Sequence, residues 1–187
     1  VKAAGCSKVI LIGHSMGGAV LPQAARIMPE RAMGLIGVDT LCDIEYPLNR
    51  EGLDQMIAPL EKDFPKGARE FVMPMFIPQS DPKVRQWVLS DMPAAPKAVA
   101  LSALREMMNL YITGDMARAF DPIHMPIVLV NGDLWPVNLE ANRRHMSDLE
   151  TIVLKNADHY LMMNRTKDFN PALEKAVGMI QKKAQKP

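Results

Sequence analysis

Short apolar runs alternate along the chain with longer segments in which apolar residues recur at helical spacing. The runs that predict strands are Lys8–Ile12, Gly34–Val38, Ile127–Val130 and Thr151–Leu154. Runs of this kind, without alternating polar residues, are typical of parallel strands covered on both faces. The pattern therefore predicts an α/β protein with a parallel sheet and flanking helices.

Between the second and third runs the pattern changes, because prolines become frequent and no strand-like run is convincing. The best helix candidates there are Glu51–Leu60, Pro82–Leu89 and Lys97–Tyr111. Methionines recur in the same segment, at Met56, Met73, Met75, Met92, Met107, Met108 and Met116. Methionine at helical spacing more often fills a core than lines a binding surface, yet such a layer would suit a hydrophobic substrate. We therefore predict a core of residues 1–42 and 121–187 with an inserted helical cap of residues 43–120.

Further helices are predicted from capping residues. Val1–Ser7 resembles the end of a helix, and Met16–Met28 has helical spacing. Asn138 is expected to cap a helix that reaches about residue 146. The last helix is expected over Asn170–Ile180, with its proline at the first helical position.

Length and charge restrict the classes of function. A chain of 187 residues forms one domain, and no apolar run approaches the roughly 20 residues of a membrane span. The formal charge of +1 provides no basic field for nucleic acid, so a small apolar ligand is expected. Cys6 and Cys42 are expected to be free thiols, which favours the cytoplasm if a compartment must be chosen. The cysteines and histidines have no zinc-type spacing, and we expect no metal or organic cofactor.

The first apolar run leads directly into Gly13-His14-Ser15-Met16-Gly17-Gly18. A turn this sharp between a strand and a helix is favoured by glycines two positions before and after its apex, where side chains would crowd the backbone. The Ser15 hydroxyl would then be exposed, with the Met16 N–H aimed at the place where an oxyanion forms. A G-x-S-x-G pattern arises by chance in about one chain of this size in twenty, so a glycine-rich turn with a structural serine is the alternative.

A serine nucleophile needs a base, and the chain offers four histidines. His14 precedes Ser15 directly and is expected to project to the opposite side. His145 lies on a predicted surface helix, and His124 lies just before a strand, where a structural role is expected. His159 follows the last predicted strand, at the end of the sheet where α/β proteins place their sites, and is the predicted base.

The base in turn needs a carboxylate that fixes its tautomer. Asp39 and Asp133 both follow predicted strands, and both lie between Ser15 and His159 in the chain. Asp158 adjoins the histidine and is awkwardly placed to reach its ring. The residues alone leave Asp39 and Asp133 as alternatives.

The order of serine, aspartate and histidine, the motif and the helical insertion together resemble the α/β-hydrolase family. The resemblance implies that Ser15 is the nucleophile, that the Met16 N–H is an oxyanion-hole donor and that His159 is the base. In many members the acid lies three residues after a glycine that ends the penultimate strand, a position that Trp135 occupies here. Other members place it after the strand before the cap, which favours Asp39 over Asp133.

The family builds further strands, and the loop with a second oxyanion-hole donor, before the serine turn, and this sequence contains neither. Loss of one such donor costs about 10²- to 10³-fold in rate, so we expect reduced or absent activity in the 187 residues alone. The first strand would also form an exposed apolar edge. A preceding segment or a second copy is the expected partner there.

The predicted function is cleavage of a carboxylic ester of a small to medium apolar substrate through an acyl-enzyme. His14, Cys42, Trp135 and Met162 are expected to contact the substrate. Hydrolysis of a carbon–carbon bond and cofactor-free peroxidase chemistry would use the same three catalytic residues. A non-catalytic small-molecule receptor on the same scaffold is the alternative from a different class. An epoxide or haloalkane hydrolase is disfavoured because those members have an aspartate where Ser15 stands.

Overall fold

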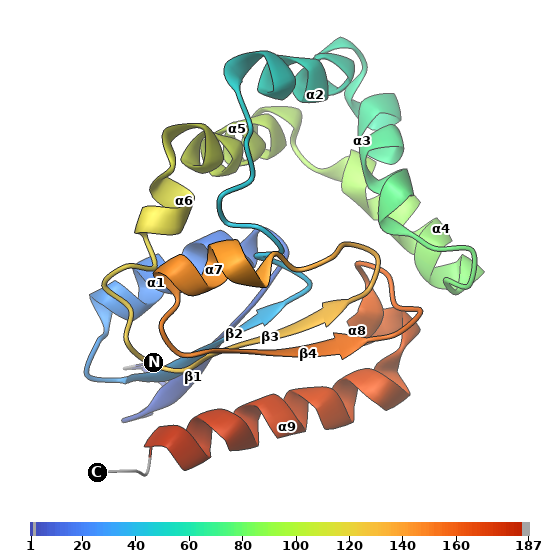
Figure 1. Cartoon of the computed structure of the whole chain (residues 1–187). Helices are drawn as coiled ribbons and strands as arrows, with labels where there is room; N and C mark the ends of the chain where they lie inside the picture. The colour runs from blue at the N-terminus through green and yellow to red at the C-terminus, as the bar shows by residue number, and fades with distance from the viewer. Residues whose placement is uncertain (2, 185–187) are drawn as a thin grey trace.

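The computed structural model describes residues 1 and 3–184, and its centre is a parallel sheet (Figure 1). The sheet has four strands in the order β1-β2-β3-β4. Their bounds are β1 Val9–His14, β2 Ala32–Val38, β3 Ile127–Gly132 and β4 Leu149–Leu154. In register, Gly13 of β1 is opposite Gly37 of β2, which is opposite Leu129 of β3. The four predicted strands are confirmed, with boundaries that differ by one or two residues.

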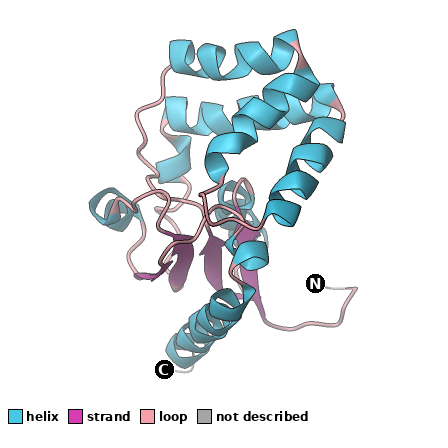
Figure 2. Ribbon diagram, turned by 90° about the vertical axis from the view of Figure 1, so that its right-hand side faces the viewer, coloured by secondary structure: helices cyan, strands magenta, loops and turns pink. Residues whose placement is uncertain are grey.

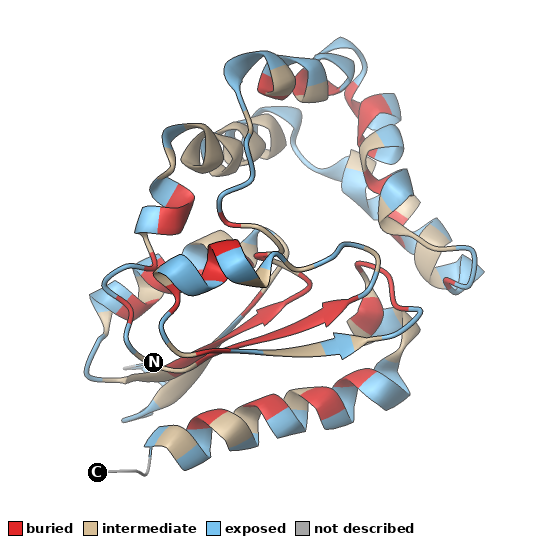
Figure 3. Ribbon diagram, in the orientation of Figure 1, coloured by how far each residue is buried: buried red, intermediate tan, exposed pale blue. Residues whose placement is uncertain are grey.

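Helices cover both faces of the sheet. Helices α1 (Gly17–Ile27) and α7 (Leu139–His145) lie on one face, and α8 (Leu161–Asn164) and α9 (Thr166–Ala184) lie on the other (Figure 1). Adjacent strand residues point to opposite faces of the sheet. Leu35 and Leu129 therefore pack in the core on the side of α1, and Ile36 and Val128 pack in the core on the side of α9. Figure 3 shows β3 buried along its whole length and β2 buried from Gly34 to Val38 between these layers.

Strand β1 differs because it lies at the edge of the sheet. Ile12 in its middle is 52% exposed, whereas Ile36 and Leu129 of the inner strands are 0% exposed. The expectation that this run is buried on both faces is wrong, whereas the expectation of an exposed apolar edge is confirmed, because no strand lies on the outer side of β1 among the described residues.

The segment between β2 and β3 is helical. Its helices are α2 Arg50–Lys62, α3 Phe64–Val72, α4 Pro82–Asp91, α5 Lys97–Thr113 and α6 Asp115–Arg118, with short 3-10 turns at Met73–Met75 and Met92–Ala94. Asn49, Asp63 and Asp81 cap the first residues of α2, α3 and α4 by accepting backbone N–H groups. Leu60, Phe64 and Ala68 form a separate small core. Figure 1 shows α2 and α5 beyond α7, away from the sheet, while α3 and α4 descend beside them toward the ends of the strands; Figure 2 shows the same helices above the sheet from a second side.

Three local expectations are wrong. Residues 3–5 form a turn with Gly5 at φ +68° instead of a helix end, and residue 2 lies outside the described residues. Helix α9 begins at Thr166, so Pro171 lies inside it instead of at its first position. The buried Phe169 packs against the sheet and explains the longer helix, because tertiary contacts offset the backbone hydrogen bond that proline cannot make. Helices α3, α6 and α8 were not predicted. The described helices include none that is both long and apolar enough to cross a membrane.

Candidate active site

The turn after β1 holds Ser15 in the left-handed backbone region, at φ 53°. A Cβ on Gly13 would lie 2.5 Å from the Gly17 carbonyl oxygen, and one on Gly18 would lie 2.2 Å from Thr40 Oγ1. A Cβ on Gly17 would meet nothing within 4 Å. The expectation that space requires glycine at Gly17 is therefore wrong, whereas at Gly13 and Gly18 the close packing does require it. Met16, which is expected to supply its N–H to an oxyanion, is the N-cap residue of α1.

Ser15, His159 and Asp39 form one continuous chain of hydrogen bonds. The Ser15 hydroxyl lies 2.8 Å from His159 Nε2, and His159 Nδ1 lies 2.6 Å from Asp39 Oδ2. The His159 and Asp39 side chains are 8% and 2% exposed. With Asp39 accepting the Nδ1 proton, the Nε2 lone pair faces the serine hydroxyl and accepts its proton. The arrangement can therefore convert a neutral hydroxyl into a nucleophile.

Asp39 is held by the ends of β2 and β3. Its backbone has φ 42°, a strained conformation for a residue with a side chain. Its N–H donates to the Val130 carbonyl at 3.1 Å, and its Oδ1 accepts the Gly132 N–H at 2.8 Å. The second carboxylate oxygen is thereby aimed at His159, because the first is fixed to the neighbouring strand.

Asp133, the alternative acid, is turned elsewhere. Its Oδ1 accepts the Ala157 N–H at 3.2 Å, and Lys155 Nζ lies 3.9 Å from Oδ2. Desolvation raises the pKa of Asp133, but backbone donors of Ala157 and Asn156 and the Lys155 charge lower it, with a net pKa below the ordinary value. The structure therefore brings Asp39, and not Asp133, to the histidine.

His14 contacts His159 itself. Its Nε2 lies 2.9 Å from the His159 carbonyl oxygen, and the two rings are 4.6 Å apart. Burial lowers the pKa of His14, and the neighbouring His159 lowers it further, so its ring is neutral at pH 7 and donates to that carbonyl. The other two histidines are elsewhere, since His124 is exposed and His145 contacts Asp121 and Glu45.

The remaining residues expected to contact substrate have three different surroundings. Trp135 is 37% exposed, and its ring lies edge-on to that of His159, with centroids 5.5 Å apart. Cys42 is half-buried beside Asn131, and burial raises the pKa of its thiol to about 12. Met162 is partly buried and packs against the core cluster that contains Phe169, and its substrate contact stays a prediction.

Two residues of the site were not predicted from the sequence. Thr40 donates its hydroxyl to the Ser15 carbonyl at 2.7 Å, and Asn131 donates to the Thr40 carbonyl at 2.9 Å. Their positions directly after β2 and near the end of β3 are the signal that could have identified them, because the carboxyl ends of parallel strands meet at one edge.

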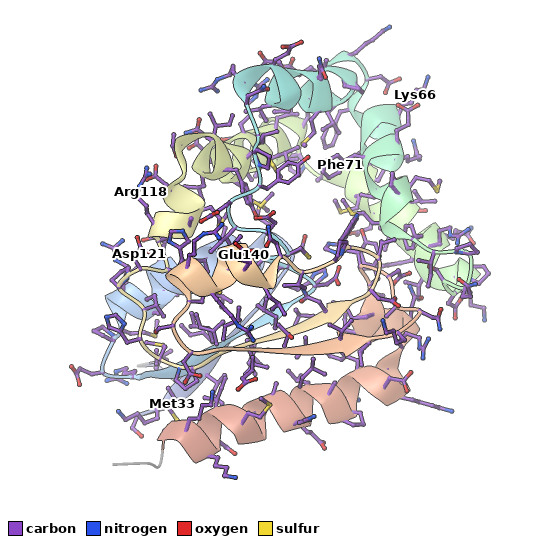
Figure 4. The ribbon with its side chains drawn as sticks, in the orientation of Figure 1. Met33, Lys66, Phe71, Arg118, Asp121 and Glu140 are labelled. Carbon is purple, nitrogen blue, oxygen red and sulfur yellow. The ribbon has the colours of Figure 1, made fainter. Side chains whose placement is uncertain are left out.

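An apolar hollow of about 310 Å³ lies among the helices of the insertion. Its lining includes Met56, Pro74 and Phe71, and Figure 4 labels Phe71 on the inner side of α3. Met56 therefore lines a surface, whereas Met116 is 1% exposed and fills a core. No cluster of three or more potential metal ligands occurs among the residues that the structure describes.

A buried aspartate, a histidine and a serine at a strand-to-helix turn of a parallel sheet form the arrangement that is typical of the α/β-hydrolase fold. The profile of the Alpha/beta hydrolase family matches residues 1–172, and the chain belongs to that family. The predicted family and fold are confirmed. Among curated proteins, none matches the sequence.

Solved structures with this fold are larger than the chain. A bromoperoxidase from Bacillus anthracis is 15% identical with a TM-score of 0.77, covering 95% of this chain and 70% of its own. A thermophilic esterase from Thermogutta terrifontis, solved with malate bound, is 21% identical with a TM-score of 0.76, covering 96% and 68%. A 2-hydroxy-6-oxo-6-phenylhexa-2,4-dienoate hydrolase from Rhodococcus sp. strain RHA1 is 18% identical with a TM-score of 0.67, covering 92% and 65%. At these identities the likeness establishes the fold alone.

Proposed function

We propose that the protein is a serine hydrolase that cleaves a carboxylic ester of a small to medium apolar substrate. The observation that carries the proposal is the unbroken chain of hydrogen bonds from Ser15 Oγ through His159 to Asp39, at 2.8 and 2.6 Å. Membership of the Alpha/beta hydrolase family supports a hydrolase, and esterases are among its structural neighbours.

In the proposed reaction His159 Nε2 takes the Ser15 proton as the serine oxygen attacks the ester carbonyl. The Met16 N–H and the first turn of α1 face the developing oxyanion. His159 then gives the proton to the departing alcohol, which leaves Ser15 acylated. The same imidazole takes a proton from a water molecule, whose oxygen attacks the acyl carbon and releases the acid and the free serine.

The substrate is proposed to lie between His159 and the insertion of residues 43–120. Trp135 supplies an exposed aromatic surface beside the His159 ring. Cys42 contributes a neutral thiol, because its raised pKa keeps the proton in place at neutral pH. His14, whose ring lies 4.6 Å from that of His159, and Met162 are also proposed to contact the substrate.

The test is labelling with a fluorophosphonate together with turnover of a short-chain nitrophenyl ester. Ser15→Ala is expected to abolish both, whereas Ser102→Ala, at an exposed serine of α5, is expected to leave both unchanged. Equal ester turnover by parent and Ser15→Ala would refute the proposal. Labelling without ester turnover would favour the carbon–carbon hydrolase or peroxidase alternatives, and binding without either would favour a receptor.

We also propose that the outer edge of β1 pairs with a further strand. The exposed Ile12 and an outer edge that pairs with no strand in the described part of the chain support this, because such an edge is prone to pair with another chain. The size of the chain in solution, alone and mixed with a polypeptide that supplies additional strands, tests it. A monomer that is unchanged by the added polypeptide would contradict the proposal.

A further inference from the structure

The loop that carries His159 is fastened to the helical insertion as well as to the sheet. We name residues 158–164, which include α8, the histidine loop. We name residues 75–81, from the last residue of the first 3-10 turn to the residue before α4, the cap turn. The His159 N–H donates to the Met75 carbonyl at 3.1 Å. In Figure 1 the lower end of the α3 and α4 pair approaches the start of α8. The backbone of the proposed base is therefore held by the insertion.

A buried carboxylate joins the same two segments. Asp158 is 0% exposed, and its oxygens accept hydrogen bonds from the Tyr160 N–H at 2.9 Å, from Asn164 Nδ2 at 2.6 Å and from the Ser80 hydroxyl. Asn164 in turn accepts the Asp81 N–H at 3.1 Å. Asp158 forms no ion pair with any residue that the structure describes. A buried carboxylate is stable only when hydrogen-bond donors surround it. Asp158 therefore holds the cap turn in place through the Ser80 hydroxyl.

Ser80 has its hydroxyl fixed from both sides. Its oxygen accepts the Ile77 N–H at 2.9 Å while its proton is donated to Asp158, and the residue is 5% exposed. Beside it, the Phe76 and Tyr160 rings stack with centroids 4.8 Å apart. The cap turn therefore meets the histidine loop through a polar and an aromatic contact.

We propose that Asp158 and Ser80 are positioning residues of His159. They hold the cap turn on the histidine loop, and the cap turn holds the His159 amide, so that the imidazole stays between Asp39 and Ser15. Neither residue touches the reacting atoms. The inference rests on the proposed function and adds that the insertion takes part in assembling the site.

The matched pair for the test is Ser80→Ala and Ser90→Ala. Ser90 lies on α4 and donates to the Gln86 carbonyl at 2.9 Å in an exposed position, so its loss controls for removal of a hydroxyl from the insertion. Ser80→Ala is expected to lower kcat about 10- to 100-fold with KM changed less than about twofold, because small misplacements of a catalytic group cost rates of this order. Ser80→Thr is expected to restore most of the rate, and Ser90→Ala to match the parent.

Active-site labelling separates positioning from folding. In Ser80→Ala the fraction of molecules labelled by a fluorophosphonate is expected to equal that of the parent, while the labelling rate falls with kcat. A reduced labelled fraction with a normal rate would overturn the inference, because it would mean only that fewer molecules fold. Unchanged kcat in Ser80→Ala, or an equal loss in Ser90→Ala, would also overturn it.

Amide hydrogen exchange gives a readout that needs no turnover. Ser80→Ala and Asp158→Asn are expected to speed exchange in the histidine loop and the cap turn together, and Ser90→Ala in neither. If the parent protein has no esterase activity, the proposed function is refuted, but the coupling between the two segments can still be measured by exchange. Exchange that stays at the parent rate in the histidine loop of Ser80→Ala would refute the coupling.

Discussion

The inner strands of the sheet and the helices of the insertion bury their residues to very different extents. All six residues of β3 are buried, whereas α5, across its seventeen described residues Lys97–Thr113, has none that is fully buried. Figure 3 shows the contrast directly. Asp39 follows the well-packed strand β2, and Ser15 follows the edge strand β1 beside it, whereas α5 of the insertion has only partly buried and exposed residues. We expect local opening to cost less free energy around α5 than in the inner strands.

His159 is where the two regions meet. Its ring lies between Ser15 and Asp39, which belong to the sheet, while its backbone N–H is bound by Met75 of the insertion. We therefore expect substitutions in the sheet to have the largest effects on activity and stability, and substitutions in the insertion to change binding and the position of His159.

The largest effect is expected for the acid. Asp39→Asn should lower kcat/KM by about 10³- to 10⁴-fold, because the amide cannot hold the Nδ1–H tautomer of His159. Asp133→Asn is the matched control and should cost less than about tenfold, since Asp133 accepts the Ala157 N–H instead. The measurement is ester hydrolysis by both variants. A larger loss in Asp133→Asn would reverse the assignment.

Core packing should show the contrast in stability. Leu129→Ala, at a residue that is 0% exposed in β3, is expected to lower the free energy of unfolding by about 2–5 kcal/mol through the cavity it leaves. Leu104→Ala, at a half-buried position of α5, should cost less than about 2 kcal/mol. Urea unfolding midpoints measure both. Equal losses would mean that the insertion is as tightly packed as the sheet.

Substrate contact should give a smaller effect that depends on the substrate. Trp135→Ala is expected to raise KM for an aromatic ester about three- to tenfold and to change KM for an acetyl ester of an aliphatic alcohol little, because stacking on the indole is lost. Trp87→Ala, at a tryptophan of α4 that is 55% exposed, is the control. Equal changes for both esters would remove Trp135 from substrate recognition.

The smallest effect is expected at the two connections into the insertion. His145 of α7 contacts Glu45, before the insertion helices, at 2.9 Å and Asp121, after them, at 2.6 Å; Figure 4 labels Asp121 beside α7. Partial burial lowers the pKa of His145, but the two carboxylates outweigh it and the net pKa is raised. The contribution to stability is thus complete below about pH 6.5 and is lost as the pH rises through the raised pKa.

Unfolding measured from pH 5.5 to 8 tests this contact. His145→Gln should lose stability relative to the parent at the acid end and approach it at the alkaline end. His124→Gln, at an exposed histidine, should follow the parent throughout. A His145→Gln difference that grows with pH would contradict the expected direction.

Much of the architecture could be predicted because it depends on local patterns. The apolar runs predicted all four strands, and Asn138 does accept the Ala141 N–H as the cap of α7. Helix α3 was missed although Asp63 caps it and Pro65 opens it, since the segment is short and its apolar face is buried only against neighbouring helices. The start of α9 was misplaced for the same reason, because contacts of Phe169 with the sheet extend it.

The sequence by itself determined the sharp turn at Ser15, the buried strands around it and the histidine that follows the last strand, because each depends on neighbours in the chain. Only the tertiary structure decided which aspartate reaches His159 and that Met162 packs against the core cluster of α9. Asp39 and Asp133 both follow strands, and they differ in which groups the strand ends bring to them. That difference arises from contacts between segments about 100 residues apart, which no local pattern records.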